Sequence, residues 1–104
     1  MTPQTDIPDL ARARRDGAVV VDVREPSEYV AGHVPGALNV PLSTVASRAG
    51  GLPDGRLYVV CASGGRSKAA TDVLRRAGRD AVSVAGGTQG WVAAGNPVTA
   101  GSQP

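Results

Sequence analysis

A chain of 104 residues is long enough for one domain with one hydrophobic core and gives no reason to expect a second. Hydrophobic residues make up 41% of it and charged residues 19%, which is typical of a folded domain and excludes a disordered chain. The formal charge is only +2, with eleven basic residues interleaved with nine acidic ones and no phenylalanine to stack on bases. We therefore expect no nucleic-acid partner.

The cellular compartment follows from the N-terminus and from cysteine usage. Residues 1–10 include Asp6 and Asp9 and lack the basic and then apolar run of a secretory signal, and no segment approaches the length that spans a bilayer. The single cysteine, Cys61, excludes an intramolecular disulfide. We therefore predict a cytoplasmic protein without a membrane partner, in which Cys61 is either a buried structural thiol or a reactive one.

The first part of the chain alternates a helix with an apolar strand. Asp6 is typical of an N-cap, and it precedes a predicted helix over residues 7–16. The Val-rich run 18–23 is too short for a helix of its own and predicts a strand that is covered on both faces. Pro26 suits the first turn of a short helix that continues to residue 30.

The same alternation continues through the rest of the chain. We predict a brief strand over residues 37–40, a weaker helix over 43–49 and a bare hydrophobic strand over 57–61. Apolar residues then recur at helical spacing over residues 69–77. The run 81–84 predicts the last strand.

A short helix is expected around residues 91–94, and residues 99–104 form a polar tail without periodicity. We therefore predict one domain over residues 1–98. Helices that alternate with unbroken apolar strands predict an α/β fold, with a mostly parallel sheet and helices on both of its faces.

Cys61 lies where a predicted strand ends and a helix is about to begin, which is where open parallel α/β sheets bind their ligands. The next four residues have no bulky side chain, so their amides can turn inward while the helix adds its positive end. Such a cradle stabilises a thiolate and makes it a nucleophile at neutral pH. The residues expected to bind the substrate around the sulfur are Ala62, Ser63, Gly64, Gly65, Arg66 and Ser67.

The guanidinium of Arg66 suits an oxyanion such as thiosulfate. The hydroxyl of Ser67 is expected either to cap the helix or to donate to the bound anion. A lone cysteine is more often a small hydrophobe at the end of a buried strand. The Gly-Gly-Arg-Ser sequence at this turn favours a reactive Cys61, because a structural cysteine needs no such neighbours.

Three further side chains have candidate roles. Asp22 and Arg24 are expected to form an ion pair that supports the loops, since buried opposite charges generally need partners. His33, in a Gly/Pro-rich turn, is left out of the catalytic set because a nucleophilic cysteine needs no general base once its thiolate exists. Trp91 is expected to pack in the core.

Four blocks of sequence together resemble the rhodanese family, over roughly residues 7–98. They are VDVREPSEY at 21–29, GHVPGALNVP at 32–41, the loop CASGGR at 61–66 and GGTQGW at 86–91. The resemblance implies a three-layer fold with a five-stranded, mostly parallel sheet, a persulfide on Cys61, and transfer of that sulfur to a nucleophilic acceptor.

The length and charge of the loop refine this expectation. Sulfurtransferases of the family have four residues between the loop cysteine and arginine, as here, whereas related phosphatases have five. Relatives that prefer thiosulfate often carry a basic residue inside the loop, where this chain has the neutral Ala62 and Ser63 and only Lys68 just outside.

We therefore predict a sulfurtransferase, without metal or cofactor, that moves sulfane sulfur from thiosulfate or a persulfide to a thiol or cyanide. The alternative is a sulfur-carrier or interaction module that a protein partner loads and that shows little turnover alone. A cysteine phosphatase is disfavoured by the loop length. A protein with a purely structural cysteine is disfavoured by the combined motifs.

Overall fold

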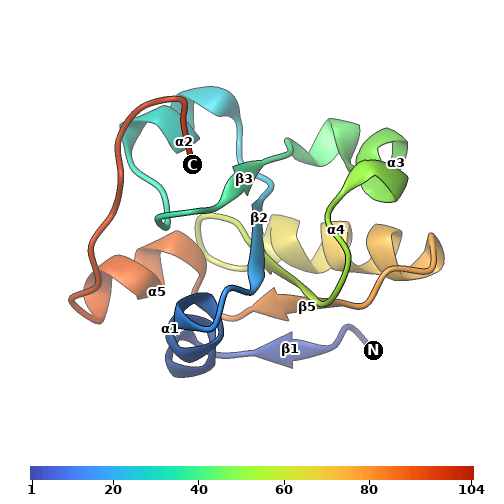
Figure 1. The fold of residues 1–104 in the computed structure, drawn as a ribbon, viewed down its shortest axis with the longest axis horizontal. Helices are drawn as coiled ribbons and strands as arrows, with labels where there is room; N and C mark the ends of the chain where they lie inside the picture. Colours follow the sequence, from blue (N-terminus) through green and yellow to red (C-terminus); the bar gives the residue numbers. More distant parts are fainter.

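The strands form one parallel sheet in a computed structural model that describes residues 1–104. Its order is β1-β5-β4-β2-β3, and every neighbouring pair runs parallel. In chain order the strands are β1 (Gln4–Thr5), β2 (Val19–Asp22), β3 (Leu38–Asn39), β4 (Leu57–Val60) and β5 (Ala81–Val84). The helices are α1 (Ile7–Arg15), α2 (Pro26–Ala31), α3 (Val45–Arg48), α4 (Gly65–Arg76) and α5 (Gly87–Ala93), with 3₁₀ turns η1 (Leu42–Thr44) and η2 (Ala49–Gly51) flanking α3 (Figure 1).

Helices cover both faces of the sheet, so the predicted three-layer α/β architecture is confirmed. Alternate residues of the central strands face opposite sides, and each side has its own core. Leu57 and Val59 of β4 pack with Leu74 of α4 and with α3 on one face. Tyr58 and Val60 pack on the other face with α1, α2 and α5. All four residues of β4 are therefore buried, as its bare apolar run predicts.

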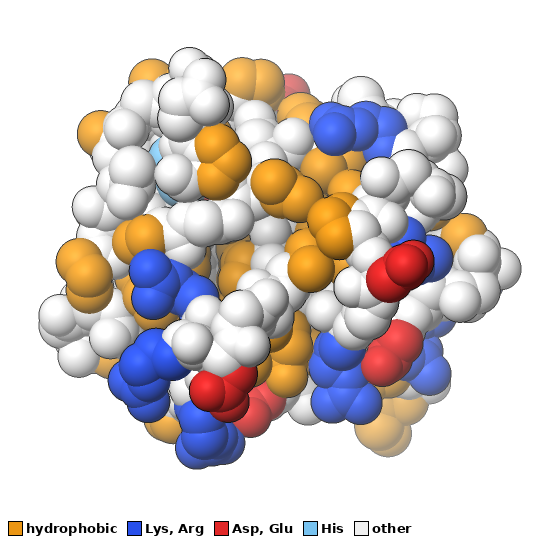
Figure 2. All heavy atoms as spheres, viewed as in Figure 1, with side chains coloured by type: hydrophobic (Ala, Val, Ile, Leu, Met, Phe, Trp, Pro, Cys, Tyr) orange, Lys and Arg blue, Asp and Glu red, His pale blue; other side chains and the backbone are white.

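Local signals start the helices. The Asp6 side chain accepts a hydrogen bond from the Asp9 amide at 3.0 Å and caps α1, as predicted. Pro26 occupies the first turn of α2, where the Glu28 carboxylate accepts from the Glu25 amide at 3.0 Å. Basic side chains gather over α1 at the lower left of Figure 2, with acidic ones among them. No helix is long and apolar enough to cross a lipid bilayer.

Most predicted elements are confirmed within one or two residues, α4 begins four residues before the periodic stretch 69–77, and three other elements differ. The edge strand β1 was not predicted, because two polar residues beside Pro3 carry no alternating pattern and pair only because β5 offers an open edge. The expected helix over 43–49 is a short α3 between two 3₁₀ turns. Helix α5 begins at Gly87, well before residue 91, because contacts with the loop after β4 override the low helix propensity of glycine.

The chain runs from the end of α5 back to α2, where Figure 1 places the C-terminus, so residues 99–104, the expected polar tail, lie beside α2. Thr99 and His33 exchange both backbone hydrogen bonds at 2.9 Å, and the Gly101 amide donates to the Val30 carbonyl. The buried His33 ring places Nδ1 2.8 Å from the Tyr29 carbonyl oxygen and Nε2 2.9 Å from that of Gln103. His33 thus has structural contacts at both ring nitrogens.

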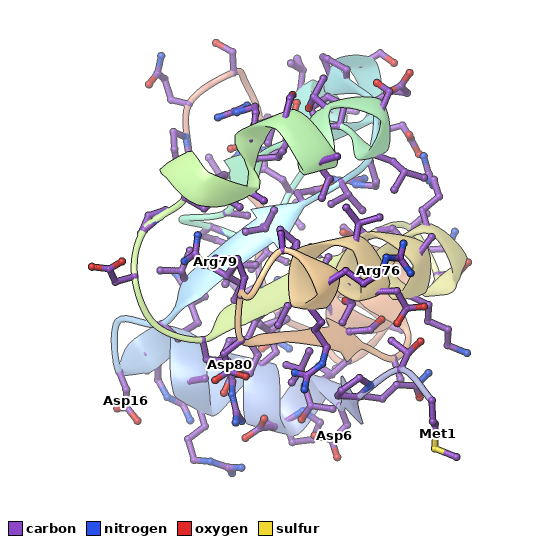
Figure 3. The ribbon with its side chains drawn as sticks, turned by 90° about the vertical axis from the view of Figure 1, so that its right-hand side faces the viewer. Met1, Asp6, Asp16, Arg76, Arg79 and Asp80 are labelled. Atoms are coloured by element: carbon purple, nitrogen blue, oxygen red, sulfur yellow. The ribbon has the colours of Figure 1, made fainter.

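The opposite end of the sheet is held by the connection from α4 to β5, where Figure 3 shows Arg79 and Asp80. Arg79 Nη1 donates to the carbonyl oxygens of Ala49 at 2.6 Å and Leu52 at 3.1 Å. The Leu57 amide at the start of β4 donates to the Asp80 carbonyl at 2.7 Å. The strands β4 and β5 are therefore joined at their amino ends, and the loops that follow them lie at their carboxyl ends.

Candidate active site

Cys61 directly follows β4, the central strand, at the carboxyl edge of the sheet. Cys61 is only 1% exposed, and the Gly64 amide donates a hydrogen bond to its Sγ at 3.0 Å. Gly64 has φ +132°, a conformation that side chains disfavour, so the tight turn over the sulfur depends on glycine. The predicted turn of amides toward Sγ is therefore present in the structure.

Helix α5 holds the loop from outside. The Thr88 amide donates to the Cys61 carbonyl at 2.8 Å, and the Gln89 amide donates to the Ala62 carbonyl at 3.0 Å. A Cβ on Gly87 would lie 2.4 Å from the Cys61 carbonyl oxygen, so only glycine permits this approach. Because the carbonyls turn outward to α5, the loop amides are free to turn toward the sulfur.

Ser67, in the first turn of α4, lies below the sulfur. Its Oγ is 3.6 Å from Cys61 Sγ, donates to the Gly64 carbonyl at 3.0 Å and lies 2.8 Å from Ser83 Oγ. Burial acts to raise the pKa of Cys61, but the Ser67 hydroxyl and the amides of Ser67, Gly64 and Ser63 favour the thiolate. The pKa of the Cys61 thiol therefore lies below its ordinary value.

Arg66 has a partner that the sequence did not indicate. Its Nη1 and Nη2 donate to the two carboxylate oxygens of Glu28 at 2.6 and 2.9 Å, across the gap between α4 and α2. The Arg66 hydrogen bonds, followed by that of the Glu25 amide, lower the pKa of Glu28 to about 2, so this ion pair persists at neutral pH. The side chains remain 37% and 35% exposed, so the pair lies at the surface, where a competing anion can reach it.

Asp22 and Arg24 form the expected ion pair, with Arg24 Nε and Nη2 donating to the carboxylate at 2.8–3.1 Å. Arg24 Nη2 also donates to the Gly32 carbonyl at 2.8 Å, and Asn39 Nδ2 donates to the carbonyls of Asp22 and Arg24 at 3.1 and 3.0 Å. Asp22 pairs in register with Val60, the residue before Cys61. The charged pair therefore links the end of β2 to the turn after α2, and the Asn39 side chain joins β3 to the same segment beside the cysteine loop.

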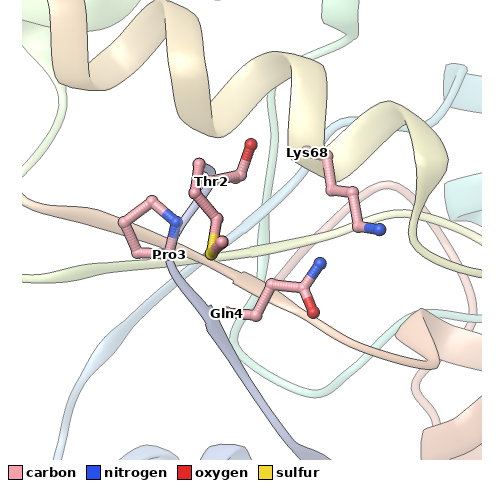
Figure 4. Close-up of a pocket in the computed structure, with 5 residues that line it drawn as sticks. Thr2, Pro3, Gln4 and Lys68 are labelled. Carbon is pink, nitrogen blue, oxygen red and sulfur yellow. The ribbon is translucent and has the colours of Figure 1, made fainter.

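Two cavities border the Arg66–Glu28 pair. One, of about 560 Å³, includes Glu28 and Ala62 together with Thr88 and Val92 of α5. The other, of about 390 Å³, includes Arg66 with Val23 and Leu42. Lys68 instead lines a separate hollow with residues 1–4, where Figure 4 shows it near Gln4.

The loop residues predicted from the sequence do lie together, but their exposure differs. Gly64 and Ser67 are buried beside the sulfur, Ala62 and Arg66 are partly buried, and Ser63 and Gly65 are exposed. Sequence reasoning missed three residues of this region: Glu28, Asn39 and Ser83. Each has an ordinary local explanation, as a helix-capping acid, a residue of a short strand and a small strand residue, so only the tertiary contacts reveal it.

Fold and site together define a parallel α/β protein that presents one cysteine in an amide-lined loop at the carboxyl end of its central strand. The chain belongs to the family of the rhodanese-like domain, whose family model matches residues 6–94. It is 39% identical to an HTH-type transcriptional regulator of Mycobacterium tuberculosis over 98 residues, which are 90% of this chain and 43% of the regulator.

Two more proteins connect the family to sulfur chemistry. The chain is 35% identical to the "Putative sulfur carrier protein YrkF" of Bacillus subtilis, over 69% of this chain and 40% of that protein. The structure of a human single-domain sulfurtransferase matches with a TM-score of 0.80 and 29% identity, over 89% of this chain and 97% of that one. The chain spans less than half the length of the two bacterial relatives. At the level of the family, these likenesses support sulfur transfer.

Proposed function

We propose that the protein is a sulfurtransferase in which Cys61 takes up sulfane sulfur as a persulfide and passes it to a thiol or cyanide. The observation that carries the proposal is the hydrogen bond at 3.0 Å from the Gly64 amide to Cys61 Sγ, in a loop that begins a twelve-residue helix. Amides and a helix N-terminus favour negative charge, first on the thiolate and then on the outer sulfur of a persulfide. The family and its sulfurtransferase structure support the same chemistry.

The proposed reaction exchanges one sulfur–sulfur bond for another. The Cys61 thiolate attacks the sulfane sulfur of thiosulfate, the sulfur–sulfur bond of the donor breaks, and sulfite leaves with the electron pair. With an organic persulfide as donor, the leaving group is the thiolate. An acceptor thiolate or cyanide then attacks the outer sulfur, and Cys61 leaves again as a thiolate. The cycle needs no metal or cofactor, and it needs a free thiol, for which we propose a reducing, cytoplasmic compartment.

We expect incubation with thiosulfate or an organic persulfide to add one sulfur atom to the protein, and cyanide or a thiol to remove it. Intact-protein mass spectrometry measures both steps. Cys61→Ser should give no adduct, because the chain has no other cysteine. Ser47→Ala, a change at an exposed serine of α3 that lies outside the loop and keeps the thiol, is the matched control and should still be loaded. Absence of an adduct with every donor, or an adduct on Cys61→Ser, contradicts the proposal.

A second candidate function is a sulfur carrier loaded by a protein partner. The likeness to the sulfur carrier protein of Bacillus subtilis favours it, as does the loop, in which neither Ala62 nor Ser63 carries a charge. A carrier accepts sulfur on Cys61 but turns over small donors and acceptors slowly. Steady-state formation of thiocyanate from thiosulfate and cyanide therefore separates the two functions.

The Arg66–Glu28 pair predicts opposite effects of two substitutions on loading from thiosulfate. Arg66→Ala should slow loading about ten- to a hundredfold, because a charged hydrogen bond to the donor is worth about 1.5–3 kcal/mol. Glu28→Gln should accelerate it by up to about tenfold, because the guanidinium is released while the glutamine oxygen still caps α2. Arg56→Ala, which removes an exposed arginine paired with Asp80, is the control and should change nothing. Unchanged loading by Arg66→Ala would exclude a role of Arg66 in donor binding.

A further inference from the structure

Three side chains with polar or sulfur atoms meet beneath the cysteine loop, between α4 and β5. Ser67 and Ser83 are 0% and 1% exposed, and their Oγ atoms lie 2.8 Å apart. Ser67 Oγ is also 3.0 Å from the Gly64 carbonyl oxygen and 3.6 Å from Cys61 Sγ. The contact with Ser67 is the one hydrogen bond of the Ser83 hydroxyl.

The number of hydroxyl protons decides the direction of this hydrogen bond. A serine hydroxyl has one proton to donate and can accept two hydrogen bonds. If Ser67 donated to Ser83, the Ser83 proton would be buried without an acceptor, and the Gly64 carbonyl would lose the Ser67 hydroxyl as one of its donors, beside the Lys68 amide at 3.3 Å. If Ser83 donates to Ser67, every buried proton has a partner. A buried donor without an acceptor is costly, so Ser83 is the donor.

We propose that Ser83 is a positioning residue that acts through Ser67, directing the Ser67 proton toward the Gly64 carbonyl and Cys61 Sγ. In the thiol form, the Cys61 S–H donates to Ser67 Oγ and the Ser67 proton goes to the Gly64 carbonyl. When the thiol loses its proton, Ser67 turns its O–H to the sulfur and still accepts from Ser83. The thiolate then receives hydrogen bonds from the Gly64 amide and the Ser67 hydroxyl.

The charged groups around the site lie on elements other than β5, the strand that carries Ser83. They are Arg66 on α4, Glu28 on α2, and Asp22 and Arg24 at the end of β2, whereas β5 and α5 contain no ionisable side chain. Replacing Ser83 leaves all four charges in place. A change in Cys61 titration after this substitution therefore reports on the hydroxyl pair and not on a lost charge. The consequence for catalysis rests on the proposed sulfur transfer, but the titration does not.

The test is the pH dependence of Cys61 alkylation by iodoacetamide, measured without any sulfur donor. The wild-type midpoint should lie below the value of about 8.5 for a free thiol. Ser83→Ala and Ser67→Ala should each raise it by about 0.3 to 1 pH unit, a two- to tenfold fall in the thiolate-to-thiol ratio. The midpoint of the double variant should equal that of Ser67→Ala, because Ser83 acts only through Ser67.

Two further variants separate positioning from packing. Ser83→Thr keeps a hydroxyl and should keep the wild-type midpoint. Thr71→Val removes a buried hydroxyl that has no hydrogen-bond partner from α4, the helix that carries Ser67. It should also leave the midpoint unchanged. The proposal is overturned if either Ser83→Ala or Ser67→Ala leaves the alkylation midpoint unchanged. It is also overturned if Ser83→Ala raises the midpoint as much in the Ser67→Ala variant as in the wild type. If the wild-type midpoint is low and rises in Ser83→Ala, but no persulfide forms with any donor, the proposed function is rejected and the role of Ser83 is supported.

Discussion

Asp22→Ala is expected to lower the free energy of unfolding by about 3–5 kcal/mol, because it leaves a buried guanidinium without its counter-charge. The Arg24 side chain is only 8% exposed, and the Asp22 carboxylate accepts from its Nε, its Nη2 and its backbone amide. After the substitution, Arg24 retains the Gly32 carbonyl as a partner but no anion. Urea denaturation at neutral pH measures the loss.

Two comparisons make this result specific to the buried charge. Asp22→Asn keeps the shape and one oxygen acceptor, so its loss should fall between the wild type and alanine. Asp80→Ala removes an exposed carboxylate paired with Arg56 at 3.2 Å, and should cost at most about 1 kcal/mol. A loss below about 1 kcal/mol for Asp22→Ala would mean that Arg24 finds solvent, and that the pair does not hold the loops.

Gly87→Ala is expected to destabilise the protein by about 2–4 kcal/mol and to disturb the cysteine loop directly. The residue has φ +55°, which costs a non-glycine residue about 1–3 kcal/mol where the conformation must be kept. The new Cβ would also lie 2.4 Å from the Cys61 carbonyl oxygen and 2.8 Å from that of Ala62. Relief of this clash separates α5 from the loop and weakens the hydrogen bonds from the Thr88 and Gln89 amides.

The matched control is Gly65→Ala, in the first turn of α4 on the same loop. A Cβ there meets no atom within 4 Å, and the residue has no positive φ. Because alanine favours a helix over glycine, this variant should be neutral or more stable by up to about 1 kcal/mol. Urea denaturation and the rate of sulfur loading are measured for both. Equal stability of the two variants would show that the loop moves freely relative to α5.

The elements with local signals could be predicted from the amino-acid sequence alone. The Val-rich run of β2 and the bare apolar run of β4 predict strands covered on both faces, because a strand that lies between two helical layers must be apolar whatever its neighbours are. Asp6 marks the start of α1 because the cap bond spans only three residues. The position of Cys61, at the end of a strand and before a flexible turn, was predicted for the same reason.

The groups that surround the sulfur could not be predicted from the sequence, because they come together only in the folded chain. Arg66 meets Glu28 across 38 positions of sequence, and Ser67 meets Ser83 across 16, so these contacts depend on where α2 and β5 lie relative to α4. The start of α5 at Gly87 likewise depends on the Cys61 carbonyl as an acceptor. A glutamate that caps a helix and a serine in a strand satisfy local rules without these partners. Tertiary packing brings Glu28 and Ser83 to the site, and the local sequence pattern does not indicate these contacts.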